Sequence, residues 1–111
     1  MNTQDNPNKI LVRRIYEEMW NQANPAVAQE IFTRPEGVMK FVTEFLAAFP
    51  DLHHSVEEII CEGNHAAARF NARGTHTRRW REYPASGQAI FYTGVTWVHI
   101  TDGKIDEHHT W

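Results

Sequence analysis

The sequence has little cysteine and no long apolar run. Cys61 is the only cysteine among 111 residues, so no internal disulfide can form. Its neighbours Ile59 and Ile60 predict a buried thiol on a strand rather than a catalytic one. Met1 is followed by polar residues instead of a basic start, and no apolar run is long enough to cross a bilayer. These absences predict a cytoplasmic protein that has no membrane partner.

The chain also lacks a net positive charge, since 11 Lys and Arg residues stand against 14 Asp and Glu residues and give a formal charge of -3 at pH 7. Phosphate binding needs a net basic face, so we predict that nucleic acid is not a partner. Arg78, Arg79 and Arg81 surround Trp80 and could grip an anion, but Glu82–Pro84 follows with loop character. The preferred interpretation is a solvated loop whose tryptophan packs on the body or on a partner subunit.

Seven histidines are present, but their spacing does not form a metal site. His53 and His54 are adjacent at the start of a predicted strand, no two histidines lie four apart on a predicted helix, and the cysteine has no nearby partner. No serine or cysteine lies in a sharp turn flanked by glycines, as an exposed nucleophile would. We therefore predict no metal, no cofactor and no nucleophilic catalysis.

What the chain does have is apolar and aromatic content, at 41% and 12%, which is enough for one hydrophobic core. We expect a single domain over residues 1–111. The first half has helical periodicity. Asn6 followed by proline predicts a helix over Pro7–Gln22, and Pro25 begins a short second helix that ends before Pro35. Large apolar residues at helical spacing over Val38–Phe49 predict a third helix, which the next proline ends.

From Leu52 onward the apolar pattern alternates, which predicts strands near 53–62, 65–77, 87–100 and 104–111. Glu62–Asn64 and Thr101–Gly103 have the composition of tight turns, so the first two strands and the last two should form antiparallel hairpins. Helices followed by strands predict an α+β fold in which three N-terminal helices pack on a curved antiparallel sheet.

Four segments occur in one order along the chain: Trp20-Asn21, Phe49–Leu52, Gly74–His76, and Asp102–Ile105 followed by Glu107-His108. This order resembles the SnoaL-like polyketide cyclases, in the nuclear-transport-factor-two-like superfamily that includes ketosteroid isomerase, scytalone dehydratase and limonene epoxide hydrolase. The resemblance implies a cone-shaped sheet, or cystatin-like α+β roll, whose mouth holds a hydrophobic small-molecule ligand. It also implies a homodimer formed through the outer face of the sheet, where Trp97 and His99 are expected.

Two departures from the family pattern bear on the chemistry. SnoaL-type cyclases carry an acid/base Asp just before the tryptophan that matches Trp111, and a His on the preceding strand; this chain has Thr110 and Thr96 there. A threonine hydroxyl cannot act as a base near neutral pH, which disfavours the family's aldol cyclisation. The segment between the second and third helices is also reduced to Thr33–Glu36, so the pocket is expected to be smaller, more open or completed by a partner.

A polar row on the second predicted strand is one candidate site. Arg69, Asn71 and Arg73 share one face, because successive side chains on a strand alternate. Arg69–Asn71 looks like the Arg-x-Asp pair that faces the pocket in the epoxide-hydrolase relatives, with an amide replacing the carboxylate. We predict that Arg69 and Asn71 are catalytic and that Arg73 binds substrate. The alternative is a row that faces solvent or an interface.

His108 is the predicted acid/base, because an imidazole titrates near neutral pH and His108 shares a strand face with Thr110. Its alternative role is a hydrogen-bonded histidine in the pocket wall. The full set of predicted ligand-binding residues is Tyr16, Trp20, Phe45, Arg73, His76, Tyr92, Thr96 and Thr110.

Two functions remain open on the sequence. The first is a cofactor-free isomerase, cyclase or dehydratase that acts by proton transfer on a hydrophobic carbonyl or cyclic compound, with Arg69, Asn71 and Tyr92 polarising an oxygen. The second is a ligand-binding or dimerisation module of the same fold that has lost the acid/base pair. The two threonines favour the second function, and the polar rows favour the first.

Overall fold

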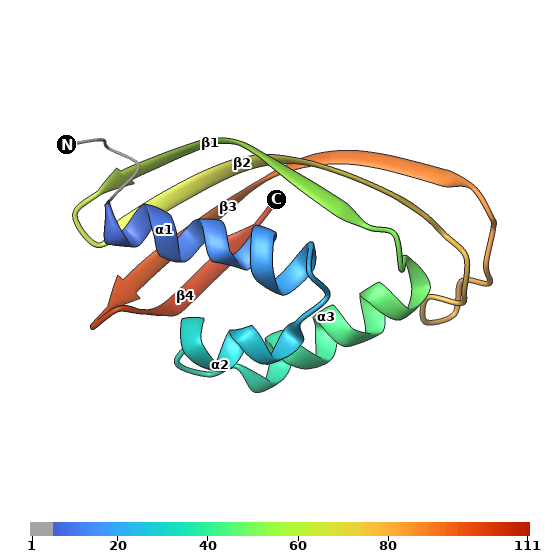
Figure 1. The fold of residues 1–111 in the computed structure, drawn as a ribbon, viewed down its shortest axis with the longest axis horizontal. Coiled ribbons are helices and arrows are strands. Elements are labelled where there is room, and N and C mark those ends of the chain that lie inside the picture. The colour runs from blue at the N-terminus through green and yellow to red at the C-terminus, as the bar shows by residue number, and fades with distance from the viewer. Residues whose placement is uncertain (1–5) are drawn as a thin grey trace.

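The computed structural model describes residues 6–111, which form a layer of helices on one face of an antiparallel sheet (Figure 1). The helical layer contains α1 (Pro7–Arg14), which continues into the π-helical segment η2 (Ile15–Trp20), then η3 (Pro25–Val27), α2 (Ala28–Ile31) and α3 (Glu36–Ala48). The sheet contains β1 (His53–Glu62), β2 (His65–Thr75), β3 (Ala89–Thr101) and β4 (Lys104–Thr110). The predicted α+β class is therefore confirmed.

Local sequence accounts for the helix boundaries. The Asn6 side chain accepts hydrogen bonds from the backbone N–H groups of Asn8 (2.9 Å) and Lys9 (3.3 Å), and Pro7 occupies the first helical position. The predicted helix over Pro7–Gln22 is not uniform, because its second half is π-helical and the N–H of Asn21 donates to the carbonyl of Tyr16 (2.8 Å). Such widened turns occur often at functional sites.

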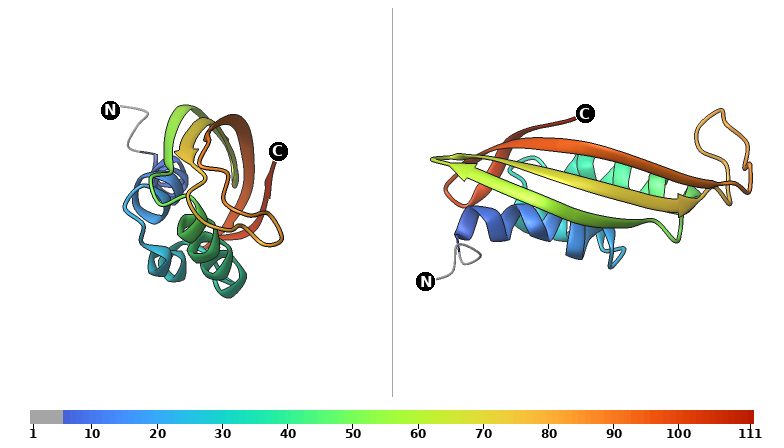
Figure 2. Two further views of the ribbon diagram at one scale, coloured as in Figure 1. Left: turned by 90° about the vertical axis from the view of Figure 1, so that its right-hand side faces the viewer. Right: turned by 90° about the horizontal axis from the view of Figure 1, so that it is seen from above.

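The four strands lie in the order β1-β2-β3-β4, and each neighbouring pair is antiparallel. Register shifts interrupt the β1–β2 pair between Val56 and Glu58 and the β3–β4 pair between His99 and Ile100. Such bulges increase the local twist of a sheet. The strands curve over the helical layer, which leaves the helices on the concave side (Figure 2).

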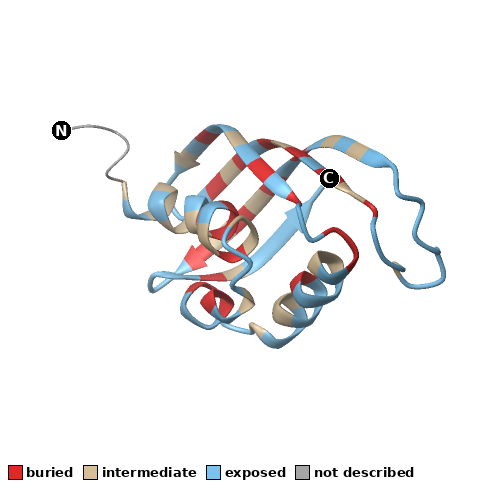
Figure 3. Cartoon of the chain, turned by 45° about the vertical axis from the view of Figure 1, so that its right-hand side comes forward, coloured by how far each residue is buried: buried red, intermediate tan, exposed pale blue. Residues whose placement is uncertain are grey.

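Burial alternates along the strands, as Figure 3 shows by the bands of colour on β2 and β3. The buried residues of β2 are Ala66, Ala68, Phe70, Ala72 and Gly74. Those of β3 are Gly94, Thr96, Val98 and Ile100. The apolar side chains in this set, which exclude the glycines and Thr96, meet Val12, Ile15, Ile31 and Val42 of the helical layer in one core cluster.

Gly94 lies where three parts of the chain meet. A Cβ atom at this position would stand 2.6 Å from the carbonyl oxygen of Trp111 and 2.7 Å from Cζ of Phe70. Because that space is closed to any side chain, the glycine allows the Phe70 ring to approach β3 closely. It also allows Trp111 to pair with Val95 through two backbone hydrogen bonds of 2.9 Å.

The loop between β2 and β3 folds back onto the helical layer. Trp80 packs edge-on against Phe45 (ring centroids 4.9 Å apart) and Phe41 (5.8 Å), and the guanidinium of Arg81 lies 4.6 Å from the Trp80 ring. The arginine-rich segment is thus a loop whose tryptophan packs on the body, as we predicted. Within residues 6–111, none of the helices has the length and apolar character needed to cross a membrane.

Candidate functional site

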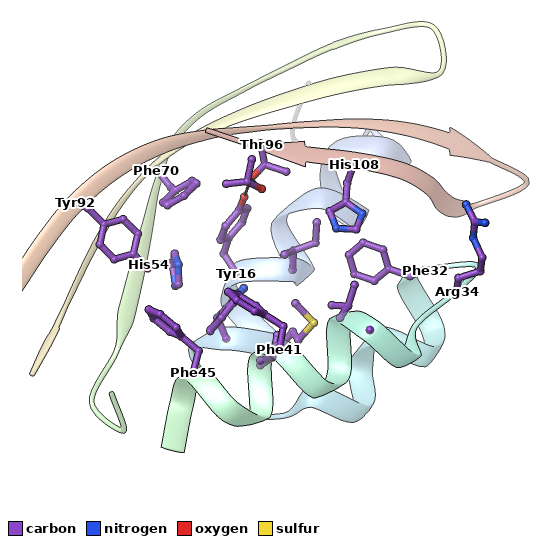
Figure 4. Close-up of a pocket in the computed structure, with 17 residues that line it drawn as sticks. Tyr16, Phe32, Arg34, Phe41, Phe45, His54, Phe70, Tyr92, Thr96 and His108 are labelled. Carbon is purple, nitrogen blue, oxygen red and sulfur yellow. Dashed lines mark hydrogen bonds between the residues drawn. The ribbon is translucent and has the colours of Figure 1, made fainter. Parts of the chain in front are cut away.

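A cavity of about 700 Å³ lies between the concave face of the sheet and the helices (Figure 4). Its walls are mainly aromatic and aliphatic. The helical layer and the segment after α2 contribute Ile15, Tyr16, Met19, Trp20, Phe32, Arg34, Gly37, Val38, Phe41, Val42 and Phe45. The sheet contributes His54, Phe70, Tyr92, Thr96, His108 and Thr110. A mostly apolar cavity with a few convergent polar groups is the usual form of a small-molecule site.

A chain of hydroxyl groups crosses one wall of the cavity. Tyr16, on η2, donates a hydrogen bond to Oγ1 of Thr96 on β3, and that atom is 3.0 Å from Oγ1 of Thr110 on β4. Burial raises the pKa of Tyr16 to about 12, although the hydrogen bond to Thr96 opposes this shift. The phenol of Tyr16 therefore remains protonated, so the three hydroxyl groups can donate and accept hydrogen bonds but none of them is a base.

His108 lies on the same face of β4 as Thr110, where it pairs with Val98 and contacts the Phe32 ring at 5.1 Å between centroids. Partial burial, followed by the nearby His109, lowers its pKa below the ordinary value. A lowered pKa keeps the imidazole neutral near pH 7, which is the form that accepts a proton. His108 is therefore the side chain of this wall best suited to act as a base.

At the other end of the cavity His54 is enclosed by aromatic rings, as Figure 4 shows for Tyr16, Phe45, Phe70 and Tyr92. Its side chain is 4% exposed. Burial, and to a smaller extent the neighbouring His53, lowers the pKa of His54 from 6.5 to about 4. This imidazole is therefore neutral at physiological pH.

The structure brings six of the predicted ligand-binding residues to the cavity together with His108. They are Tyr16, Trp20, Phe45, Tyr92, Thr96 and Thr110. His76 is not among them, because it lies beyond the end of β2, stacks on Phe49 (4.8 Å between centroids) and has Nδ1 3.3 Å from the hydroxyl of Ser86. His76 does not line this cavity, so the prediction that it binds the ligand there is wrong.

The polar row of β2 lies on the convex, outer face of the sheet, so the prediction that Arg69, Asn71 and Arg73 face the pocket is wrong. Arg69 forms an exposed ion pair with Glu58 (3.7 Å), and the Asn71 amide donates to Glu57. The physical reason is the alternation of the strand: the apolar set of β2 takes the concave face, where the helices cover it, and the polar row must then point away.

Sequence reasoning missed several wall residues, of which His54 is chemically the most important. Its signal was present, because Leu52, His54 and Val56 alternate with exposed residues at the start of β1. Phe32 and Arg34 were missed for another reason. Phe32 bridges to Ile105 of β4, and the N–H of Thr33 donates to the Ile105 carbonyl (3.0 Å), which brings this short segment to the mouth of the cavity.

Among residues 6–111 there is no cluster of three or more His, Cys, Asp or Glu side chains that could hold a metal ion. The polar groups that the cavity presents are hydroxyls, imidazoles, the Trp20 indole and the Arg34 guanidinium, and they come from η2, β1, β3, β4 and the segment after α2.

A helical layer over the concave face of a four-stranded antiparallel sheet, with a cavity between them, defines an open α+β roll. The chain belongs to the SnoaL-like polyketide cyclase family, whose sequence model matches residues 10–111. No curated protein matches the sequence.

Solved structures have the same fold. TsrD from Streptomyces laurentii is 18% identical with a TM-score of 0.88, over 99% of this chain and 90% of that one. A SnoaL-like polyketide cyclase from Agrobacterium tumefaciens is 16% identical with a TM-score of 0.78, over 100% and 91%. IdmH from Streptomyces antibioticus is 24% identical with a TM-score of 0.77, over 94% and 90%. At these identities the similarity establishes the fold.

Proposed function

We propose that this protein binds a hydrophobic carbonyl compound in the cavity and moves a proton on it without a cofactor, with His108 as the acid/base. The observation that carries the proposal is the position of His108 beside Thr110 on the concave face of β4, at the end of the hydroxyl chain from Tyr16. Side chains two residues apart on a strand are separated by about 7 Å, a distance that a carbonyl group and its neighbouring carbon can bridge.

The proposed step is proton abstraction next to a carbonyl. His108 accepts the proton from the adjacent carbon, the C–H electron pair forms a C=C bond, and the carbonyl oxygen becomes an enolate that accepts a hydrogen bond from Thr110. The imidazolium then returns the proton to the same carbon or to a conjugated one, which balances the reaction as an exchange or an isomerisation. Thr96 and Tyr16 support this wall because a connected hydroxyl chain is polarised along its length.

Replacement of His108 by glutamine is expected to reduce proton transfer about 100-fold or more, as loss of a general base does, while ligand affinity stays nearly unchanged. The assay is exchange of the protons next to the carbonyl of tetralone, indanone and cyclohexenone in deuterium oxide, followed by NMR. His109→Gln is the matched control, because His109 lies on the opposite face of β4 and contacts Glu107 (3.0 Å). Exchange that is unaffected by His108→Gln would remove this assignment.

The second candidate function is non-catalytic ligand binding, and the observation that favours it is the occupation of both family acid/base positions by threonine. Under this alternative the parent protein binds the same ketones but does not exchange their protons. The exchange assay therefore separates the two functions when it is combined with a direct measurement of ketone binding.

We also propose a homodimer formed through the convex face of the sheet. The large apolar side chains exposed there include Phe91 (69% exposed) and Val95 (39%) of β3, beside the partly buried Trp97 and His99. A patch of this kind is an apolar liability unless a partner covers it, and a second copy of the chain offers the same patch in return. The family resemblance implies the same partner.

Light scattering at micromolar concentration is expected to give twice the chain mass of 12.9 kDa. Val95→Arg should give a monomer, because Arg69 is the cross-strand partner of Val95 on the same face, so the new guanidinium would add a second positive charge to a surface that the partner copy must bury. Glu58→Gln, on the same face, serves as the control and should remain dimeric. A parent protein that is monomeric at every micromolar concentration would contradict the dimer.

A further inference from the structure

His54 presents an unusual chemical situation within the cavity. Nδ1 of its ring is buried without a hydrogen-bond partner, and the ring makes no hydrogen bond among residues 6–111. The rings of Trp20 (5.1 Å between centroids), Phe70 (5.2 Å) and Tyr16 (5.4 Å) surround it instead. A buried polar group without a partner is costly, so its presence in a native fold needs a reason.

The side chain of Asn21 fixes the backbone of His54. The side-chain amide of Asn21 donates to the carbonyl of His54 and accepts from its N–H, each at 2.8 Å. Asn21 follows Trp20 directly after the π-helical segment η2, so the Trp20-Asn21 pair supplies both a ring against the imidazole and a two-point clamp on its backbone. The imidazole is therefore positioned by packing and by the clamp, and Nε2, which unlike Nδ1 is not fully buried, is the nitrogen that a ligand can reach.

The residues around His54 restrict which ligand groups could hydrogen-bond its imidazole. The cavity-lining residues around His54 are uncharged, whereas the cationic Arg34 lies toward the far end beside Phe32 and His108 (Figure 4). A charged ligand group would be poorly solvated among these rings. A hydroxyl group both donates and accepts a hydrogen bond, so it can pair with either tautomer of a neutral imidazole. Flat aromatic rings stack favourably on such walls.

We propose that His54 is a ligand-recognition residue whose imidazole hydrogen-bonds the hydroxyl group of a flat, uncharged, phenol-like ring held between the aromatic side chains of the cavity. This inference rests on the proposed function only in requiring that the cavity takes a small apolar molecule. It assigns the ligand two polar ends: a hydroxyl at His54, and a carbonyl at Thr110 and His108. His54 then selects the ligand and orients it, while the proton-transfer wall lies at the other end.

The test compares the binding of naphthol and naphthalene by equilibrium dialysis. These two probes differ only in the hydroxyl group, so the ratio of their dissociation constants isolates its contribution. In the parent protein we expect naphthol to bind more tightly. In His54→Phe, which retains ring volume and removes both nitrogens, the ratio is expected to fall about tenfold, the equivalent of one well-made hydrogen bond. His53→Phe is the matched control, because His53 is exposed on the opposite face of β1 and does not line the cavity, and it should retain the parent ratio.

A ratio that is unchanged in His54→Phe, or that falls equally in His53→Phe, would overturn the assignment. His54→Leu provides the same comparison if the phenylalanine variant does not fold. If neither probe binds the parent protein, both the ligand class and the role of His54 are wrong. If the ratio behaves as expected while ketone exchange is indifferent to His108→Gln, the proposed catalytic function fails and the recognition site stands.

Discussion

Replacing Phe49 by alanine is expected to lower the free energy of unfolding by about 3–5 kcal/mol, the range for loss of a buried aromatic ring. Phe49 ends α3 and is 6% exposed. Its ring is held between Phe45, at 4.6 Å, and His76, at 4.8 Å, both nearly parallel to it. Truncation would leave a gap between α3 and the end of β2 that neither neighbour can close without losing its own contacts.

Urea unfolding of the parent and of Phe49→Ala measures this cost. Tyr83→Ala is the control, because Tyr83 is 57% exposed in the loop between β2 and β3, and its stability should change by less than about 0.5 kcal/mol. A loss of under about 1 kcal/mol in Phe49→Ala would show that α3 is not packed on the sheet through this ring. Phe45, one turn earlier on α3, is only partly buried and lines the cavity, so Phe49 is the ring of this pair that belongs to the core.

The free energy of unfolding is expected to decrease as the pH is lowered, because protonation of His54 is disfavoured in the folded protein. Its pKa is about 4 in the folded chain against 6.5 for the free side chain. Below pH 6.5 the unfolded chain therefore binds a proton at His54 that the folded chain does not bind. The free energy of unfolding then decreases by about 1.4 kcal/mol for each unit by which the pH is lowered, until the folded pKa is reached. Over that window His54 should cost the parent protein about 3 kcal/mol.

His54→Phe removes this titration, so its free energy of unfolding should decrease less than that of the parent between pH 7 and pH 4. The difference between the two proteins isolates His54, because His108, Asp51 and Asp106, whose pKa values are also lowered, are the same in both. Urea unfolding at a series of pH values gives the two curves. Parallel curves would mean that His54 is solvated in the folded protein.

The elements of the fold could be predicted from local patterns. Asn6 and Pro7 mark the start of α1, Pro50 follows the end of α3, and the alternation after Leu52 marks the strands, because caps, prolines and two-residue periods act within a few residues. The π-helical turn at Ile15–Trp20 had no such signal. The periodicity there predicts ordinary helix over Pro7–Gln22, whereas Ile15–Trp20 is π-helical.

The site was only partly predictable, because the tertiary structure decides which face of a strand is covered by the helices. Alternation alone placed Arg69 and Asn71 on one side of β2 and Phe70 on the other, and it could not say which side the helices would cover. The family pattern correctly placed Thr96, Thr110 and His108 on the cavity side. His54 was set aside as half of an adjacent pair, although the same alternation separates it from the exposed His53.

The sequence by itself determined the α+β class and the pairing of neighbouring strands in hairpins, since each depends on short-range pattern. The tertiary structure alone decided which side chains meet across the cavity. Tyr16 reaches Thr96 from a helix 80 positions away, and Asn21 clamps His54 across a separation of 33. Such contacts arise when the helices close over the curved sheet, because burial of the apolar faces selects which polar groups are carried inside.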